Sequence, residues 1–189
     1  MAREFGQLRH DIWNDDDWRA RTIPAQWLYM TLISDPKLNY CGVAPWHPGR
    51  LAQRAGEASG RTVVLAALEL VEHLFLVIDE DTEEVLIRSY LKHDPILKNP
   101  RLAVTMAKDF ATLGSSKIRA VIVHELTRLK KQNPDGVAWE KDQVRTVLRQ
   151  NSAPAKDLVL DLPDGVARYF PPGLPTDLPS GFESAKGAV

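Results

Sequence analysis

The fold is decided by residues 48–90, which read PGRLAQRAGEASGRTVVLAALELVEHLFLVIDEDTEEVLIRSY. Pro48 predicts the start of a short helix and Gly56 its end, because proline is favoured in the first helical turn and glycine just after the last. Ser59 can cap a second helix over residues 60–74, whose apolar side chains occupy most of the helical circumference. Two short helices joined by a glycine-containing turn form a helix-turn-helix pattern, and the second is expected to be buried on more than one side.

A predicted β-hairpin follows the helix pair. Residues 74–78 and 85–90 are rich in aliphatic and aromatic side chains, and the six residues between them, 79–84, read DEDTEE. Two such runs separated by a short polar turn are typical of a hairpin. Five of the six turn residues are acidic, so this turn would repel the phosphates of a nucleic acid unless it points away from them.

The segment upstream of the helix pair supplies a further helix and strand. Thr22 and Pro24 are typical of a helix start, and residues 25–33 place several large apolar side chains on one face. Residues 39–44 are too few for a helix and indicate a brief strand. The predicted elements then follow the order helix, short strand, helix, helix, strand, turn, strand, which matches a winged helix. We therefore predict a mainly α (α+β) protein with a winged helix-turn-helix domain and a small β-hairpin wing in residues 1–97.

A C-terminal helical segment is predicted over residues 98–150. Amphipathic patterns indicate helices over 100–113 and from Ser115 or Ser116 to about Gln132, with a short third helix around 144–148. We expect the two longer helices to dock on the winged domain as an antiparallel pair or to form a dimerisation surface. The last 39 residues, 151–189, contain six prolines and four glycines and predict a flexible tail.

Composition excludes several classes of protein. A chain of 189 residues with a net charge of −1 is one ordinary domain with an appendage, and it is too neutral to bind nucleic acid by bulk charge. One cysteine forms neither an intrachain disulfide nor a Cys-rich zinc site. The five histidines lack the spacing of metal ligands, and no phosphate-binding glycine loop or nucleophile motif is present, so we expect no metal, no cofactor and no enzymatic activity.

The N-terminal residues lack the basic and then apolar pattern of a signal peptide, and no apolar run approaches the ~18 residues of a membrane span. We therefore expect a protein of the bacterial cytoplasm with no membrane partner.

Charge is distributed unevenly along the chain. Residues 88–131 carry ten basic and three acidic side chains, whereas residues 73–87 carry five acidic and no Lys or Arg side chains. Such asymmetry indicates an anionic partner or an acidic neighbouring segment. The alternative is a solvated helix face beside the acidic hairpin.

Candidate DNA contacts lie first on the helix pair. The start of the second helix would offer Ser59, Arg61 and Thr62 to a groove edge, and Arg50 and Arg54 of the preceding helix would contact phosphates. Arginine suits both tasks because its fork can form two hydrogen bonds with guanine or with a phosphate. Alternatively, the two arginines only solvate a short helix and the serine only caps one.

A second candidate surface lies on the predicted helix that ends near Gln132. We expect Lys117, Arg128 and Lys131 to act together there, and to join the cations of the helix pair on one exposed surface that fits a polyanion.

Five dispersed segments carry a family resemblance. They are HDIWND at 10–15, PAQWLY at 24–29, PKLNYCGV at 36–43, VIDEDTEEVLIRS at 77–89 and KHD at 92–94. Together they resemble the actinobacterial phage and prophage family of replisome-organiser-like helix-turn-helix proteins, over roughly residues 5–100. The resemblance implies a winged-helix DNA-binding module, followed by a variable region that handles oligomerisation or loads other replication proteins.

The functional expectation combines these observations. It is a DNA-binding protein of phage or prophage type that engages double-stranded DNA in replication initiation or transcriptional regulation. Replication proteins, a host protein or a second copy in a homodimer are further candidate partners. The alternative is a protein-interaction module that keeps the winged fold and uses its apolar third helix, residues 60–74, and its acidic hairpin to bind a host or phage protein.

Overall fold

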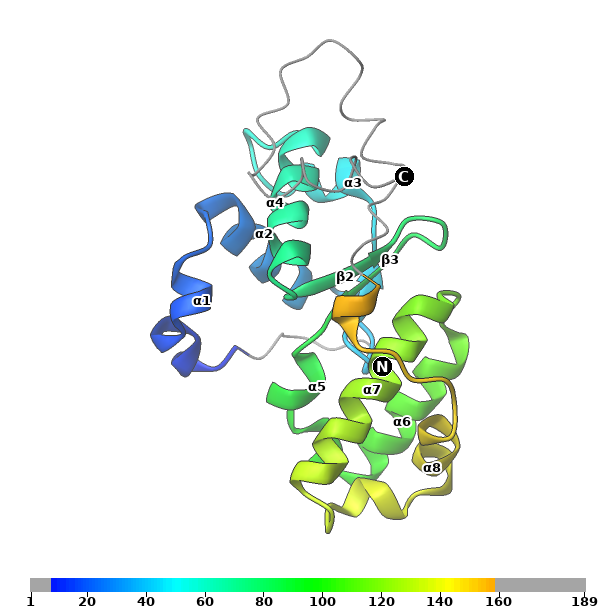
Figure 1. Ribbon diagram of the computed structural model, residues 1–189. Coiled ribbons are helices and arrows are strands. Elements are labelled where there is room, and N and C mark those ends of the chain that lie inside the picture. Colours follow the sequence, from blue (N-terminus) through cyan, green and yellow to red (C-terminus); the bar gives the residue numbers. More distant parts are fainter. Residues whose placement is uncertain (1–7, 159–189) are drawn as a thin grey trace, which may run out of the picture.

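The computed structural model describes residues 8–158 and is mainly helical, with one small antiparallel sheet (Figure 1). The first half contains η1 (His10–Asn14), α1 (Asp16–Arg19), α2 (Ile23–Ile33), β1 (Val43–Pro45), α3 (Pro48–Ala52), α4 (Gly60–Glu72), β2 (Leu76–Asp79), β3 (Glu84–Ile87) and α5 (Tyr90–His93). The second half contains η2 (Pro95–Lys98), α6 (Pro100–Thr112), α7 (Ser116–Gln132), η3 (Val137–Glu140), α8 (Asp142–Leu148) and η4 (Ala155–Asp157). The predicted α+β class is confirmed.

Local sequence signals set both ends of α4. The Ser59 side chain accepts a hydrogen bond from the backbone N–H of Thr62 at 3.1 Å, and the Thr62 hydroxyl accepts one from the backbone N–H of Ser59. This reciprocal capping satisfies backbone donors that the first helical turn leaves unpaired. At the other end Leu74 adopts a left-handed conformation with φ of 58°, which ends the helical region. The next strand therefore begins at Leu76, two residues later than predicted.

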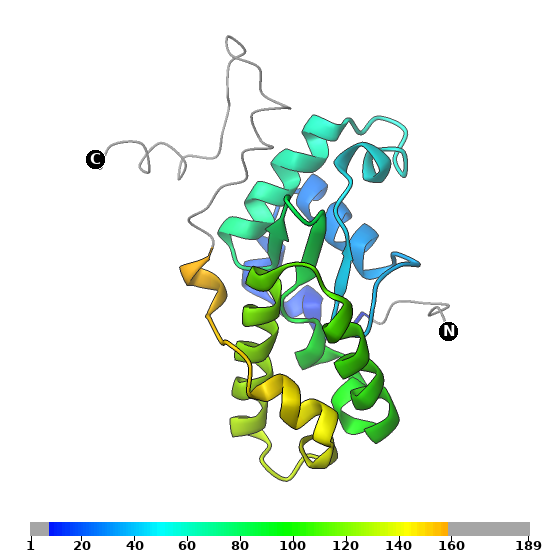
Figure 2. The ribbon, with the colours of Figure 1, turned by 90° about the vertical axis from the view of Figure 1, so that its right-hand side faces the viewer.

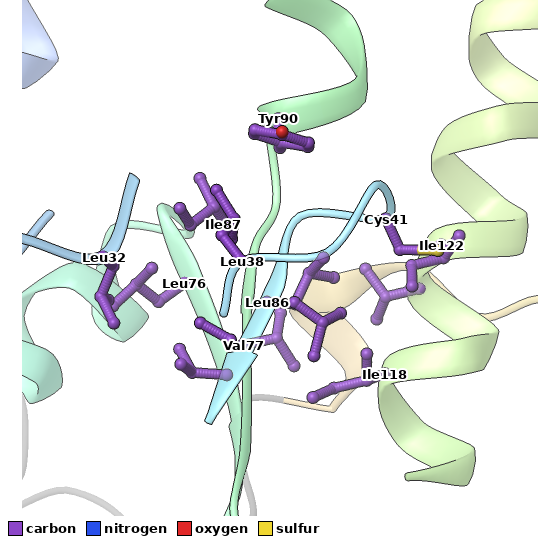
Figure 3. Packing of buried hydrophobic residues seen from close by; sticks show 14 of the residues in the cluster. Leu32, Leu38, Cys41, Leu76, Val77, Leu86, Ile87, Tyr90, Ile118 and Ile122 are labelled. Atoms are coloured by element: carbon purple, nitrogen blue, oxygen red, sulfur yellow. The ribbon is translucent and has the colours of Figure 1, made fainter. Parts of the chain in front are cut away.

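The sheet has the strand order β1-β3-β2 and both of its faces are covered. Leu76 lies opposite Ile87, and Val77 lies opposite Leu86. Because side chains alternate along a strand, the first pair faces one side of the sheet and the second pair the other. Figure 3 shows Leu32 of α2 on one side of the hairpin and α7 on the other.

Helix α7 covers the second face of the sheet. It contacts both β2 and β3, and its Ile118 and Ile122 are almost completely buried. Helix α8 packs against both α6 and α7, which places the three helices together below the sheet in Figures 1 and 2. One continuous hydrophobic core therefore runs through both halves, and the helical segment is docked on the first half.

The first segment of the chain is anchored by an aromatic cluster. Trp18 of α1 is completely buried, and its ring lies 5.1 Å from that of Tyr29 and 6.0 Å from that of Phe75 in edge-on arrangements. Such contacts add to the stabilisation that burial of large rings provides. They hold α1 against α2.

The loop before β1 is bound to α6. The backbone N–H of Tyr40 donates to Asp109 at 2.9 Å, and the Cys41 thiol donates to the backbone carbonyl of Met106 at 3.2 Å. Burial raises the pKa of this thiol well above its ordinary value, and the nearby Asp109 carboxylate acts in the same direction. Cys41 is therefore a buried, protonated packing residue.

Four further element predictions are wrong in extent. The strand predicted over 39–44 covers only Val43–Pro45, and the helix predicted to end at Gly56 ends at Ala52. The strand predicted over 85–90 ends at Ile87, and a short helix begins at Tyr90, whose buried ring packs beneath the loop at Gly42. The tail predicted from residue 151 is packed at its start, because the backbone N–H of Ala153 donates to the carbonyl of Ala120 at 3.2 Å and Ala155 is buried. The rest of the predicted tail, 159–189, lies outside the described residues.

A substitution at Gly42 tests the packing of the Tyr90 ring beneath the loop that precedes β1. Its φ is +82°, and a Cβ there would lie 2.5 Å from the Cβ of Tyr90. We expect Gly42→Ala to lower the free energy of unfolding by about 2–4 kcal/mol, from backbone strain and overpacking combined. Urea denaturation followed by circular dichroism measures this change.

The matched control is Gly49→Ala in α3, where nothing lies within 4 Å of the added Cβ. This variant should be neutral or more stable by up to about 1 kcal/mol. Equal stability of the two variants would contradict the packing of Tyr90 against Gly42.

Candidate nucleic-acid interface

The two arginines of the α3 region have different environments. Arg50 is exposed, and no ion pair or side-chain hydrogen bond joins it to another residue within 8–158. Arg54 donates from Nη2 to Asp35 at 2.8 Å and from Nη1 to the carbonyl of Thr31 at 3.3 Å. The Asp35 side chain is only 6% exposed, so Arg54 compensates a nearly buried charge and holds the end of α3 against the end of α2. Of the two, Arg50 is available to a phosphate.

The start of α4 is organised mainly for capping. The hydroxyl oxygens of Ser59 and Thr62 lie 3.0 Å apart, and both hydroxyls serve the capping box. Arg61 lies between them and is half-buried. Of the thirteen residues of α4, only Glu72 is exposed, because the helix packs on α2, α3 and β2. Base contacts from α4 would therefore come from its first turn.

Two carboxylates of the acidic turn bind the start of α7. Glu84 accepts hydrogen bonds from the backbone N–H groups of Gly114 at 3.1 Å and Ser115 at 2.7 Å. The Ser115 hydroxyl donates to Asp79 at 2.5 Å and accepts from the backbone N–H of Ile118 at 3.0 Å. Negative charge is favourable at a helix N-terminus, so these acids stabilise the docking of α7 on the hairpin.

The other three acids of the turn remain on the hairpin tip, which projects from the body of the molecule in Figure 1. Asp81 and Glu83 are exposed and Glu80 is half-buried. Glu83 lies 3.7 Å from Nδ1 of His47, which precedes α3. A polyanion that approached the tip would meet these carboxylates first.

The three cations predicted on α7 share one face of the helix. At 100° per residue, Lys117, Arg128 and Lys131 fall within about 60° of one another around the axis. Lys131 is exposed, and the other two are half-buried. His124 lies on the same face, one turn before Arg128.

A buried carboxylate connects this face to the first half of the chain. Glu125 is 5% exposed and accepts hydrogen bonds from Nη1 of Arg88 at 3.2 Å and from Nη2 of Arg128 at 2.6 Å. The sequence interpretation missed Arg88 and Glu125. A signal was present, because Glu125 is the single acid between Ser116 and Gln132 and occupies the apolar stripe of that helix.

The structure does not bring the two sets of cations together. In both Figure 1 and Figure 2, α3 and the start of α4 lie at one end of the molecule, and the end of α7 lies at the other. Arg50 and Lys131 therefore cannot share one small surface, and the expected convergence of the two sets is not found.

Comparison with known proteins finds no family model, no curated protein and no solved structure that matches this chain. Within the described part of the chain, no three His, Cys, Asp or Glu side chains are grouped to hold a metal ion. None of the helices between residues 8 and 158 combines the length and the apolar character of a membrane span.

Arg54 and Arg50 should differ in their effect on stability. Arg54→Ala removes the charged partner of the nearly buried Asp35, which then keeps only the hydrogen bond from the backbone N–H of Lys37, so we expect a loss of about 1–2 kcal/mol in the free energy of unfolding. Arg50→Ala should change stability by less than about 0.5 kcal/mol, as is usual for exposed positions. Thermal unfolding measures both, and an unchanged midpoint for Arg54→Ala would show that its ion pair contributes nothing.

Replacement of Glu125 should lower the free energy of unfolding strongly. Glu125→Gln keeps the side-chain shape but leaves two guanidinium groups without the carboxylate that compensates them, so we expect a loss of about 3 kcal/mol. The control is Glu72→Gln at the exposed position of α4, which should change stability by less than about 0.5 kcal/mol. Urea denaturation of both variants checks this, and equal midpoints would refute a structural role for Glu125.

Proposed function

We propose that this protein is a winged-helix DNA-binding protein of phage or prophage type, which acts in replication initiation or transcriptional regulation. The observation that carries the proposal is the connectivity of the first half. The element order α2-β1-α3-α4-β2-β3, together with the sheet order β1-β3-β2, is the arrangement expected for a winged helix.

The proposed DNA contacts lie at the end of the molecule formed by α3 and the start of α4. The first turn of α4 would meet a groove edge through Ser59, Arg61 and Thr62, and Arg50 would contact a phosphate. The engagement of Asp79 and Glu84 by α7 supports this proposal, because it provides a structural reason for two acids that otherwise argue against DNA binding.

A protein-interaction module with the same fold is the second candidate. It is favoured by the burial of α4, which leaves few side chains to read bases, and by the three acids Glu80, Asp81 and Glu83 at the hairpin tip. In this function the tip would contact a basic host or phage protein.

Fluorescence anisotropy with a labelled random 20-base-pair duplex tests the first candidate. The proposal predicts binding at ~50 mM salt that weakens steeply as salt increases, because each phosphate contact contributes about 0.9 to the log–log slope. Arg50→Ala should weaken binding at every salt concentration without changing the thermal midpoint.

The control is Arg149→Ala, which removes an exposed arginine just after α8, at the opposite end of the molecule. Absence of duplex binding by the wild-type chain at ~50 mM salt would exclude the DNA proposal and leave the protein-interaction module, since even nonspecific contacts survive at that concentration.

A further inference from the structure

We propose that Arg88 and Arg128 form a phosphate-binding pair, positioned by Glu125 and flanked by Lys131. The pair lies where the two halves of the chain meet, away from the end formed by α3 and α4. As a contact for a nucleic-acid backbone it rests on the proposed function and adds a second anchoring site to it.

The two guanidinium groups are held from opposite sides of the interface between the halves. Arg88 follows β3 directly and donates from Nε to the carbonyl of Leu74 and from Nη1 to Oε1 of Glu125. Arg128 lies on α7 and donates from Nε and Nη2 to Oε2 of Glu125, at 3.0 and 2.6 Å. One buried carboxylate therefore orients two arginines that are 40 positions apart in the chain.

Each arginine keeps unused donors. Among residues 8–158, Nη2 of Arg88 and Nη1 of Arg128 have no hydrogen-bond partner. The side chains of Arg88 and Arg128 are 31% and 35% exposed, so a ligand can reach them. The Glu125 side chain is only 7% exposed and is not accessible to a ligand. Donors that are already fixed lose little conformational entropy when a ligand binds.

The cluster formed by Arg88, Arg128 and Glu125 carries an excess of positive charge. Two guanidinium groups share one carboxylate, which leaves one net positive charge at the cluster, whereas Arg54 has the carboxylate of Asp35 to itself. Lys131 lies three residues after Arg128, close enough on a helix to be its neighbour. It is exposed and makes no ion pair with any residue that the structure describes.

A phosphate is the ligand class that suits this arrangement. The planar fork of arginine matches phosphate oxygens, and nearby lysine adds a point charge that requires no fixed geometry. The oxygens of one phosphate could accept from both guanidinium groups, since the two already bond to a single carboxylate. Contacts of this kind fix the register of a nucleic acid without reading its sequence.

The test uses the full chain, a labelled random 20-base-pair duplex and inorganic tripolyphosphate. The variants are Lys131→Gln, which leaves the Glu125 cluster intact, and Arg128→Gln, with Arg149→Gln as a matched control just after α8. Circular dichroism verifies that each variant is folded. Anisotropy over a salt series reports duplex binding, and the thermal midpoint reports tripolyphosphate binding.

We expect Lys131→Gln to weaken duplex binding by about tenfold at 0.1 M salt and to reduce the log–log salt slope by about 0.9, with no change for Arg149→Gln. Tripolyphosphate should raise the thermal midpoint of the wild-type chain more than that of Lys131→Gln or Arg128→Gln.

The outcomes separate this inference from the proposed function. Duplex binding by the wild-type chain with unchanged affinity and slope in Lys131→Gln and in folded Arg128→Gln overturns the phosphate pair and leaves the DNA proposal standing. Stabilisation by tripolyphosphate that the two variants lose, without any duplex binding, rejects the DNA proposal but supports the pair. A hexaglutamate peptide, added at the same concentration of negative charge, is the control for nonspecific anion binding. If tripolyphosphate does not raise the thermal midpoint, or if the peptide raises it by as much, the site is not a phosphate site.

Discussion

The Glu125 carboxylate is removed from water at the contact between the two halves of the chain, and burial of a charge is costly unless its partners are in place. Its partners come from both halves, Arg88 after β3 and Arg128 on α7. The position of α7 is consequently tied to the position of the hairpin. A slip of α7 by one turn would separate the carboxylate from Arg88, whereas Arg128 would move with it on the same helix, so the contact with Arg88 selects a single docking geometry.

The same docking explains the composition of the hairpin. Val77 and Leu86 form a face of the sheet that α7 covers, and both are buried. Asp79 and Glu84 bind the backbone and side-chain donors at the start of α7. Two acids that do not suit a nucleic-acid-binding hairpin are thus structural, and they act through the favourable interaction of negative charge with a helix N-terminus.

Much of the fold could be predicted from the sequence because its signals are local. The cap at Ser59 and the apolar stripe of α7 specify long helices within a few residues, and the predicted ranges match. The short helix at Tyr90 could not be predicted, because it depends on packing beneath Gly42, which lies 48 residues earlier. The packed segment at Ala153 likewise depends on a carbonyl of α7.

The candidate site was less predictable than the fold because it depends on contacts between residues that are distant in the sequence. Residue type and exposure nominated Arg50 and Arg54 equally, but only a contact between positions 19 residues apart shows that Arg54 is engaged with Asp35. Arg88 and Glu125 are 37 residues apart, and neither has a local signal for the other. Charge counts along a chain locate cations, but the pairing of each cation is a property of the tertiary fold.

Native-state hydrogen exchange in increasing urea tests most directly whether the two halves form one body. Backbone amides of β3 and of the middle of α7 should exchange through the same global opening, with free energies and urea dependences that converge. Exchange of the α7 amides through a smaller opening, at lower free energy and while the sheet stays protected, would show that α7 undocks independently and would contradict a docking geometry fixed by Glu125.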